Sequence, residues 1–151
     1  MTLKEKDRIL DLIERTFFEN GFQKASIDFI ASSIKMSKKT IYNYFRSKNE
    51  LLLSLINRFI SQINDEMEQF VNIDISVVEK IMLVSILLGK IGEKFTDKFI
   101  TEVRILHPLI RQKIEEFRIQ MINKNISEIF SQGINEGYII NIPPLIILTI
   151  Y

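Results

Sequence analysis

The sequence predicts an all-α fold. Apolar residues recur at three- and four-residue spacings along most of the chain, as they do on one face of a helix. No segment keeps up the strict alternation of apolar and polar residues that marks a half-buried strand. Hydrophobic residues make up 46% and charged residues 26% of the 151 residues, a balance that supports a buried core.

The first third of the chain is predicted to hold three helices. Residues 4–20 carry a helical apolar pattern, and Gly21 is expected to end that helix. Ser26 and Ser37 are suited to cap two shorter helices, the second of which runs to about Phe45. The residues of the two short helices expected to face the core are Ile27, Ile30, Ala31, Ile34, Ile41 and Phe45.

Positive charge gathers in the same part of the chain. Residues 1–60 hold eleven Lys or Arg against seven Asp or Glu, whereas the remaining residues hold nine against twelve. Between Lys35 and Lys48 there are five cations and no acid. A basic, acid-free segment within a pair of short helices is typical of an element that reads DNA.

The following residues predict a long helix and a buried one. Ser47 and Glu50 have the spacing of a capping box, so a fourth helix is expected to begin there and to reach about Phe70. Residues 77–95 are apolar on most of their circumference, which predicts a helix buried on all sides.

Prolines and glycines divide the last part of the chain. A short helix over 99–106 is expected to stop before a long amphipathic helix over 108–132, whose first residue is proline. Gly133 and Gly137 are expected to break that helix, and residues 141–144 to begin another.

The composition disfavours several classes of protein. Because the chain has no cysteine, it has no disulfide framework, thiol nucleophile or cysteine-based zinc site. The apolar runs 81–88 and 145–151 are too short to span a bilayer and no signal-peptide pattern begins the chain, so a cytoplasmic protein is expected. No catalytic constellation, metal-ligand spacing or phosphate-binding glycine loop is found, so no enzyme, metal or cofactor is predicted.

One pattern combines glycines, hydroxyl residues and aromatics at characteristic spacings. Its members are Ile9-Leu10 through Phe17, Gly21-Phe22, Ser26-Ile27, Ile30-Ala31, Ser37-Lys38-x-Thr40-Ile41-Tyr42-x-Tyr44-Phe45, Ser47-Lys48-x-Glu50-Leu51 and, later, Gly133-x-x-x-Gly137-Tyr138. The pattern resembles the tetracycline-repressor (TetR) family of bacterial transcription regulators. The resemblance implies a helix-turn-helix DNA-binding domain over residues 1–46 and a helical regulatory, ligand-binding and dimerisation domain over 47–151.

The chain departs from the family pattern in three places. Lys35 stands where the family most often has glycine in the turn, and a left-handed backbone there costs a non-glycine residue roughly 1 kcal/mol. Lys39 stands where a small residue is frequent. The family dimerises through its last two helices, and this chain is expected to stop inside the first of them, with the C-terminal helices missing.

The exposed residues of the second short helix are the predicted DNA contacts. Lys38, Lys39, Thr40 and Asn43 are expected to reach base edges, since lysine donates to guanine and asparagine pairs with adenine. Tyr42, Tyr44, Lys48 and Ser26, the last at a helix start, are expected to contact the DNA phosphates. Ser37, at the start of the second short helix, is also a predicted DNA-binding residue. The alternative is an ordinary solvated face with the tyrosines partly in the core.

A stripe of apolar residues is the predicted effector pocket, with a plain helical core as the alternative. Its candidate members are Met82, Phe95, Phe99, Phe117, Met121 and Tyr138. His107, the single histidine, either points into that pocket or caps the carbonyl groups of the preceding helix.

The predicted function is a homodimeric transcriptional repressor that binds a pseudo-palindromic DNA operator, with recognition helices about 34 to 36 Å apart or a wider multiple. A small-molecule effector is expected to release it by favouring a state in which the two headpieces have the wrong spacing. The alternative is a helical protein-interaction module, or a DNA-binding protein controlled by a protein partner.

Overall fold

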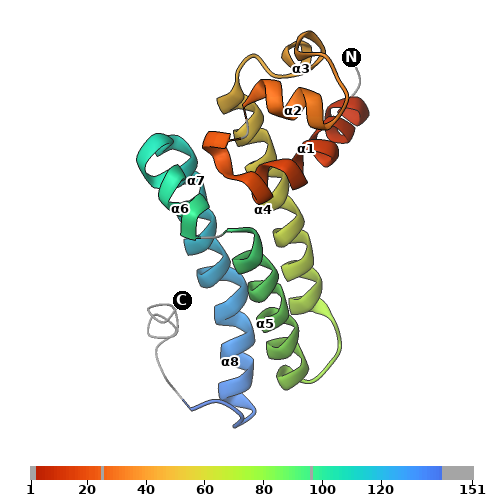
Figure 1. Cartoon of the computed structure of the whole chain (residues 1–151). Coiled ribbons are helices and arrows are strands. Elements are labelled where there is room, and N and C mark those ends of the chain that lie inside the picture. Colours follow the sequence, from red (N-terminus) through yellow and green to blue (C-terminus); the bar gives the residue numbers. More distant parts are fainter. Residues whose placement is uncertain (1–2, 25, 96, 141–151) are drawn as a thin grey trace. The chain divides into compact units, whose positions relative to one another are not determined.

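The computed structural model describes residues 3–24, 26–95 and 97–140, and its regular elements there are helices (Figure 1). In chain order they are α1 (Leu3–Lys24), α2 (Ile27–Ser33), α3 (Lys38–Tyr44), α4 (Lys48–Asn72), α5 (Val77–Lys94), α6 (Asp97–Leu106), α7 (Pro108–Met121), a π-helical turn (Ile122–Ile126) and α8 (Ser127–Asn135). The described ranges contain no strand, so the all-α prediction is confirmed. None of their helices has the length and apolarity that a membrane span requires. The helix predicted to begin at 141–144 lies outside the described residues.

Contacts divide the chain into two compact units. The first contains the chain up to Phe59 together with Gly92–Gln112, and the second contains Ile60–Ile91 and the chain from Lys113 onward. The first unit therefore includes the start of α4 and all of α6 in addition to the three helices predicted for residues 1–46.

The first unit is built around α1. This helix packs against α2 and α6, and α2 packs against α3. Its buried side chains include Ile9, Leu10, Ile13 and Phe17 from α1, and Leu51, Leu52, Leu55 and Ile56 from α4. The predicted end of the first helix at Gly21 is wrong, because α1 continues to Lys24. A glycine costs a helix interior only about 1 kcal/mol, which a helix of 22 residues tolerates.

Serine side chains begin the next three helices, as predicted. Ser26 and Ser37 accept backbone N–H groups at 3.1 and 3.0 Å and so cap α2 and α3. At the start of α4, the Ser47 hydroxyl accepts the Glu50 amide at 3.1 Å, and the Glu50 carboxylate accepts the Arg46 amide at 2.9 Å. Ser47 therefore caps α4 as predicted, while Glu50 binds the amide one residue before the cap and not that of Ser47 itself.

In the second unit, α5 buries only one of its faces. Val77, Val84 and Leu87 are buried, whereas Met82 and Ile86 are 60% and 56% exposed. The prediction of burial on all sides is therefore wrong for the described part of the chain, because neighbouring helices cover a single side of α5.

A buried lysine ties three helices of the second unit together. Lys80 of α5 donates to the carbonyl oxygen of Val71 in the last turn of α4 at 2.7 Å, and to the Gln132 side chain of α8 at 3.4 Å. The position suits a cation because the carboxyl end of a helix carries partial negative charge.

The predicted helix over 108–132 is not a single regular α-helix in the structure. A π-helical turn at Ile122–Ile126 separates α7 from α8, and Ser127 stabilises it by bonding its backbone N–H and its hydroxyl to the same carbonyl oxygen, that of Ile122. The hydroxyl bond is 2.9 Å long.

The two glycines expected to break this helix behave differently. Gly137 has a φ of 79° just beyond α8, so its predicted role is confirmed. Gly133 lies inside α8 instead, so its predicted role as a breaker is wrong. A Cβ atom there would lie 2.6 Å from Cδ1 of Ile139, so the absence of a side chain lets Ile139 pack against the helix.

Candidate nucleic-acid interface

The turn between α2 and α3 has the left-handed residue that the sequence predicts. Lys35 has a φ of 54°, and the next residue, Met36, donates its N–H to the carbonyl oxygen of Ala31 at 2.9 Å. Ala31 is buried, so a small side chain stands where the two helices approach. The strain at Lys35 is accommodated by these contacts.

Helix α3 has one buried face and one exposed face. Ile41 within the helix and Phe45 at its end are fully buried and fix α3 on the core of the first unit. Lys38, Lys39 and Asn43 are exposed. Tyr42 is also exposed, whereas the half-buried Thr40 shares a 2.8 Å hydrogen bond with Ser37 through their hydroxyl groups.

The two adjacent lysines of α3 have different surroundings. Lys38 forms an ion pair with Asp28 of α2, and both side chains are more than half exposed. Lys39 forms no ion pair with any residue in the described ranges. Lys39 therefore presents its full charge to solvent, while that of Lys38 is partly compensated.

Two predicted phosphate contacts are held within the protein. A hydrogen bond to the Glu5 carboxylate raises the pKa of the Tyr44 hydroxyl above its usual value of 10.0. Burial lowers the pKa of the Lys48 ammonium group, and the charge of Glu102 opposes that shift. Both side chains are half-buried, so they help to assemble the first unit as well as border the exposed face of α3.

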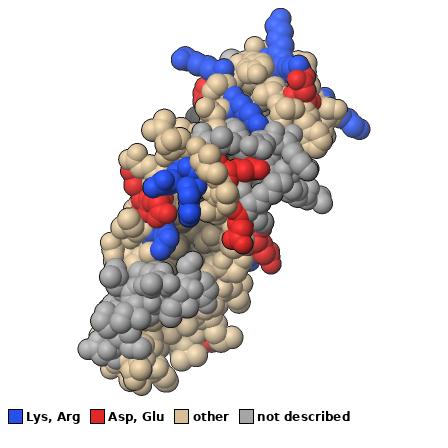
Figure 2. Space-filling view, turned by 60° about the vertical axis from the view of Figure 1, so that its left-hand side comes forward, with Lys and Arg blue, Asp and Glu red and all other residues tan. Residues whose placement is uncertain are grey.

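Figure 2 shows Lys and Arg side chains projecting from the part of the first unit that carries α2 and α3, at the top of the view. The positive charge that the sequence concentrates in residues 35–48 therefore lies on the surface formed by α2 and α3. A polyanion such as DNA is the partner that this charge favours.

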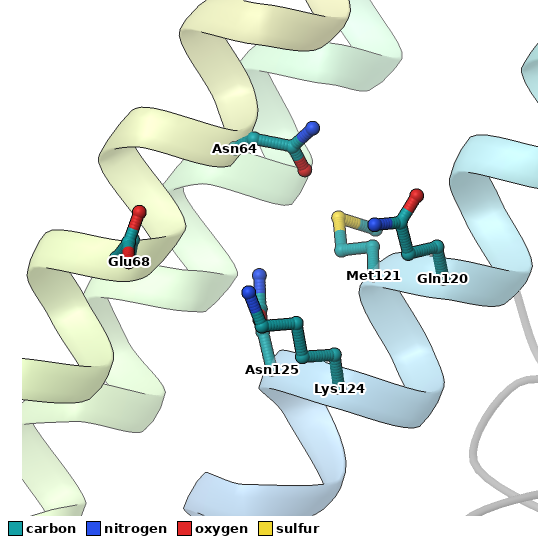
Figure 3. A pocket seen from close by; sticks show the side chains of 6 residues that line it. All are labelled: Asn64, Glu68, Gln120, Met121, Lys124 and Asn125. Carbon is teal, nitrogen blue, oxygen red and sulfur yellow. The ribbon is translucent and has the colours of Figure 1, made fainter.

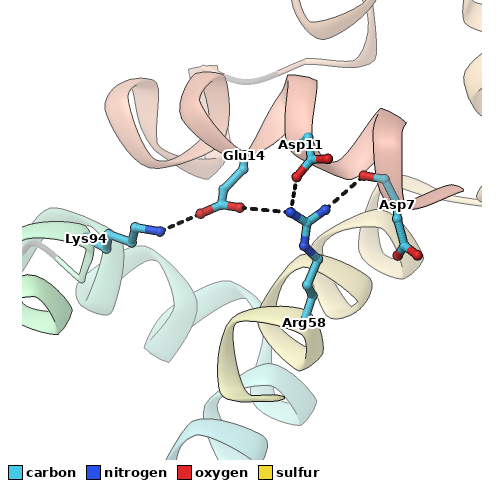
Figure 4. Close-up of polar contacts among 5 residues, drawn as sticks. All are labelled: Asp7, Asp11, Glu14, Arg58 and Lys94. Carbon is cyan, nitrogen blue, oxygen red and sulfur yellow. Dashed lines mark hydrogen bonds and ion pairs between the residues drawn. The ribbon is translucent and has the colours of Figure 1, made fainter. Parts of the chain in front are cut away.

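Within the first unit, a charged network joins α1 to α4 (Figure 4). Arg58 of α4 donates to the carbonyl oxygen of Asp7 at 2.8 Å, pairs with the Asp11 carboxylate and lies 3.9 Å from Glu14. Glu14 also accepts a hydrogen bond from Lys94 at 2.5 Å. Sequence reasoning missed this network, since its partners are far apart along the chain.

The predicted effector residues are divided between the two units. Phe95, Phe99 and His107 belong to the first unit, where the rings of Phe95 and Phe99 stand edge to face with centroids 5.4 Å apart. Met82, Phe117, Met121 and Tyr138 belong to the second unit. Phe117 and Met121 are buried there, while Met82 and Tyr138 are at least 60% exposed.

One of these residues, Met121, lines a polar pocket in the second unit (Figure 3). The pocket has a volume of about 120 Å³ and lies between α4 and the end of α7 with its π-helical turn. Its other lining residues are polar and were not predicted: Asn64, Glu68, Gln120, Lys124 and Asn125.

Comparisons with known proteins agree with this geometry. Residues 9–55 match the model of the family described as bacterial regulatory proteins, tetR family. The chain is 28% identical over 137 residues to the fatty acid metabolism regulator protein of Bacillus subtilis (strain 168), covering 87% of this chain and 69% of that protein.

Several solved structures have a similar fold, among them two transcriptional regulators. The regulator FadR from Bacillus subtilis, solved in complex with stearoyl-CoA, is 27% identical with a TM-score of 0.63, and the match covers 93% of this chain and 77% of that one. The TetR-family regulator PfmR from Thermus thermophilus is 20% identical with a TM-score of 0.70, covering 91% of this chain and 76% of that one. Residues 9–55 belong to the tetR family of bacterial regulatory proteins, and along most of its length the chain is similar to transcriptional regulators.

Proposed function

We propose that the protein is a cytoplasmic repressor that binds a pseudo-palindromic DNA operator as a homodimer and is released by a small molecule. The observation that carries the DNA-binding half is the two-faced α3 helix. Its buried Ile41 and Phe45 hold it in place, and its exposed Lys38, Lys39 and Asn43 are free to enter a major groove.

The residues of this surface divide by role. Lys39 and Asn43 read base edges, and Lys38 does so when DNA displaces Asp28 from it. Thr40 and Tyr42 add contacts beside them. Ser26, Ser37, Tyr44 and Lys48 border the same surface and position the backbone phosphates. In this proposal residues 1–46 bind DNA, and residues 47–151 regulate and dimerise.

Operator binding is tested by fluorescence anisotropy with the duplex immediately upstream of the protein's own reading frame. At physiological salt we expect this duplex to bind at least about 1000-fold more tightly than a shuffled duplex of the same length. Equal affinities for the two duplexes would refute sequence-specific repression.

For the effector, we propose a coenzyme-A thioester of a fatty acid. Support comes from the relative that is a fatty acid metabolism regulator and from the related structure that holds stearoyl-CoA. The proposal predicts that stearoyl-CoA weakens operator binding and that free stearate at the same concentration has a smaller effect. An operator affinity that stearoyl-CoA leaves unchanged would refute this half and leave the DNA-binding half intact.

A further inference from the structure

The polar pocket of the second unit is lined by one largely buried side chain that has no hydrogen-bond partner within the described residues. Asn125 lies in the π-helical turn and is only 7% exposed, yet its amide lines the pocket (Figure 3). No residue in the described ranges forms a hydrogen bond with this amide. The amide is open to the pocket, so whatever fills the pocket supplies its hydrogen bonds.

Asn125 is a polar residue within an otherwise apolar stripe, which indicates that its amide is there to bind something in the pocket. The neighbouring buried residues Met121, Ile122, Ile126 and Ile129 are all apolar, and a leucine at 125 would continue their stripe. The turn itself is held by the two bonds from Ser127 to the Ile122 carbonyl oxygen. Turns of this kind recur at functional sites in helical proteins.

The lining indicates which chemistry fits. Three carboxamides, those of Asn64, Gln120 and Asn125, each offer a donor and an acceptor. The two charged residues, Glu68 and Lys124, have opposite signs, so the pocket has no net charge with which to select an ion. A volume of about 120 Å³ equals the share of roughly four waters in the liquid. That space suits one amide group with a short alkyl chain.

We propose that this pocket binds a neutral amide group, with Asn125 pairing with the amide and Asn64 and Gln120 as its neighbours. Two sources supply this chemistry. One is a free small amide, and the other is the amide-bearing pantetheine arm of a coenzyme-A thioester. The second source rests on the proposed function, whereas the first does not.

The test is saturation-transfer NMR on the full chain with N-methylacetamide and with pantetheine, each titrated separately. We expect both probes to bind, and the Asn125→Leu and Gln120→Ala variants to bind them at least tenfold more weakly. Gln120 is exposed, so its variant remains informative if Asn125→Leu does not fold. Asn57→Leu, at an exposed position of α4 in the first unit, is the matched control and should bind both probes as the wild type does.

The two probes distinguish the sources. Pantetheine binding at least tenfold tighter than N-methylacetamide assigns the pocket to the coenzyme-A arm, and equal affinities assign it to a free amide. Binding of neither probe, or binding that both pocket variants retain in full, would overturn the proposal. Operator affinity measured on the same sample separates this failure from failure of the proposed function.

Discussion

Replacing Arg58 by methionine tests the charged network between α1 and α4. Methionine keeps much of the aliphatic length of arginine and removes the guanidinium group. The variant therefore loses the 2.8 Å hydrogen bond to the Asp7 carbonyl oxygen, the ion pair with Asp11 and the 3.9 Å contact with Glu14. The freed carboxylate of Glu14 retains Lys94 as a partner.

The burial of each partner sets the expected cost. The side chains of Arg58 and Glu14 are each only 20% exposed, so these contacts are partly shielded from water. Asp11 is 61% exposed, and its pair with Arg58 contributes correspondingly little. A hydrogen bond from a charged group contributes about 1.5–3 kcal/mol, so we expect Arg58→Met to lower the free energy of unfolding by about 2–3 kcal/mol.

The assay is urea unfolding followed by circular dichroism, with Arg118→Met as the matched control. Arg118 pairs with Glu115 at 3.9 Å, but both side chains are about half exposed, so its loss should cost no more than about 0.5 kcal/mol. A double-mutant cycle of Arg58→Met with Glu14→Gln should give a coupling energy of about 1 kcal/mol. Equal costs for Arg58→Met and Arg118→Met would refute the reasoning.

Three further predictions concern single positions. Lys39→Ala should reduce the slope of log affinity against log salt by about 0.9 for each headpiece bound, measured by anisotropy; an unchanged slope would remove Lys39 from the interface. Gly133→Ala should lower the melting temperature because its Cβ would displace Ile139, whose Cδ1 would lie 2.6 Å away, and a melting temperature equal to wild type would show that this packing adds nothing. Burial, with the charge of Lys48 assisting, lowers the pKa of His107 below 6.5 in the folded protein. The unfolded chain then binds more protons just below pH 6.5, so stability should fall as the pH drops through that value, and His107→Gln should flatten this dependence in urea titrations at pH 5 and 8.

The helix starts of the first unit and the two faces of α3 were predictable from local signals. Ser26, Ser37 and Ser47 cap helices because a serine hydroxyl accepts one of the backbone N–H groups that the first helical turn leaves unpaired. The two faces of α3 followed from Ile41 and Phe45, which recur at helical spacing. These signals lie within a few residues of the atoms that they organise, so one sequence suffices to detect them.

The features that were missed depend on distant parts of the chain. Ion pairs such as Arg58 with Asp11 join residues 47 positions apart, and no periodic pattern in the sequence predicts them. The π-helical turn leaves the apolar stripe of α7 and α8 intact, so the sequence pattern did not indicate the turn or the burial of Asn125 within it. The exposed face of α5 was missed because apolar composition predicts burial without specifying which partner provides it.

A hydroxyl-radical footprint on the protein's own upstream region tests most directly whether α3 reads DNA. The wild type should protect two half-sites whose centres are separated by a whole number of helical turns, about 10–10.5 base pairs each. The doubly charge-reversed variant Lys38→Glu with Lys39→Glu should fold, since both side chains are exposed, and should lose the protection. A footprint that this variant retains in full would contradict the account.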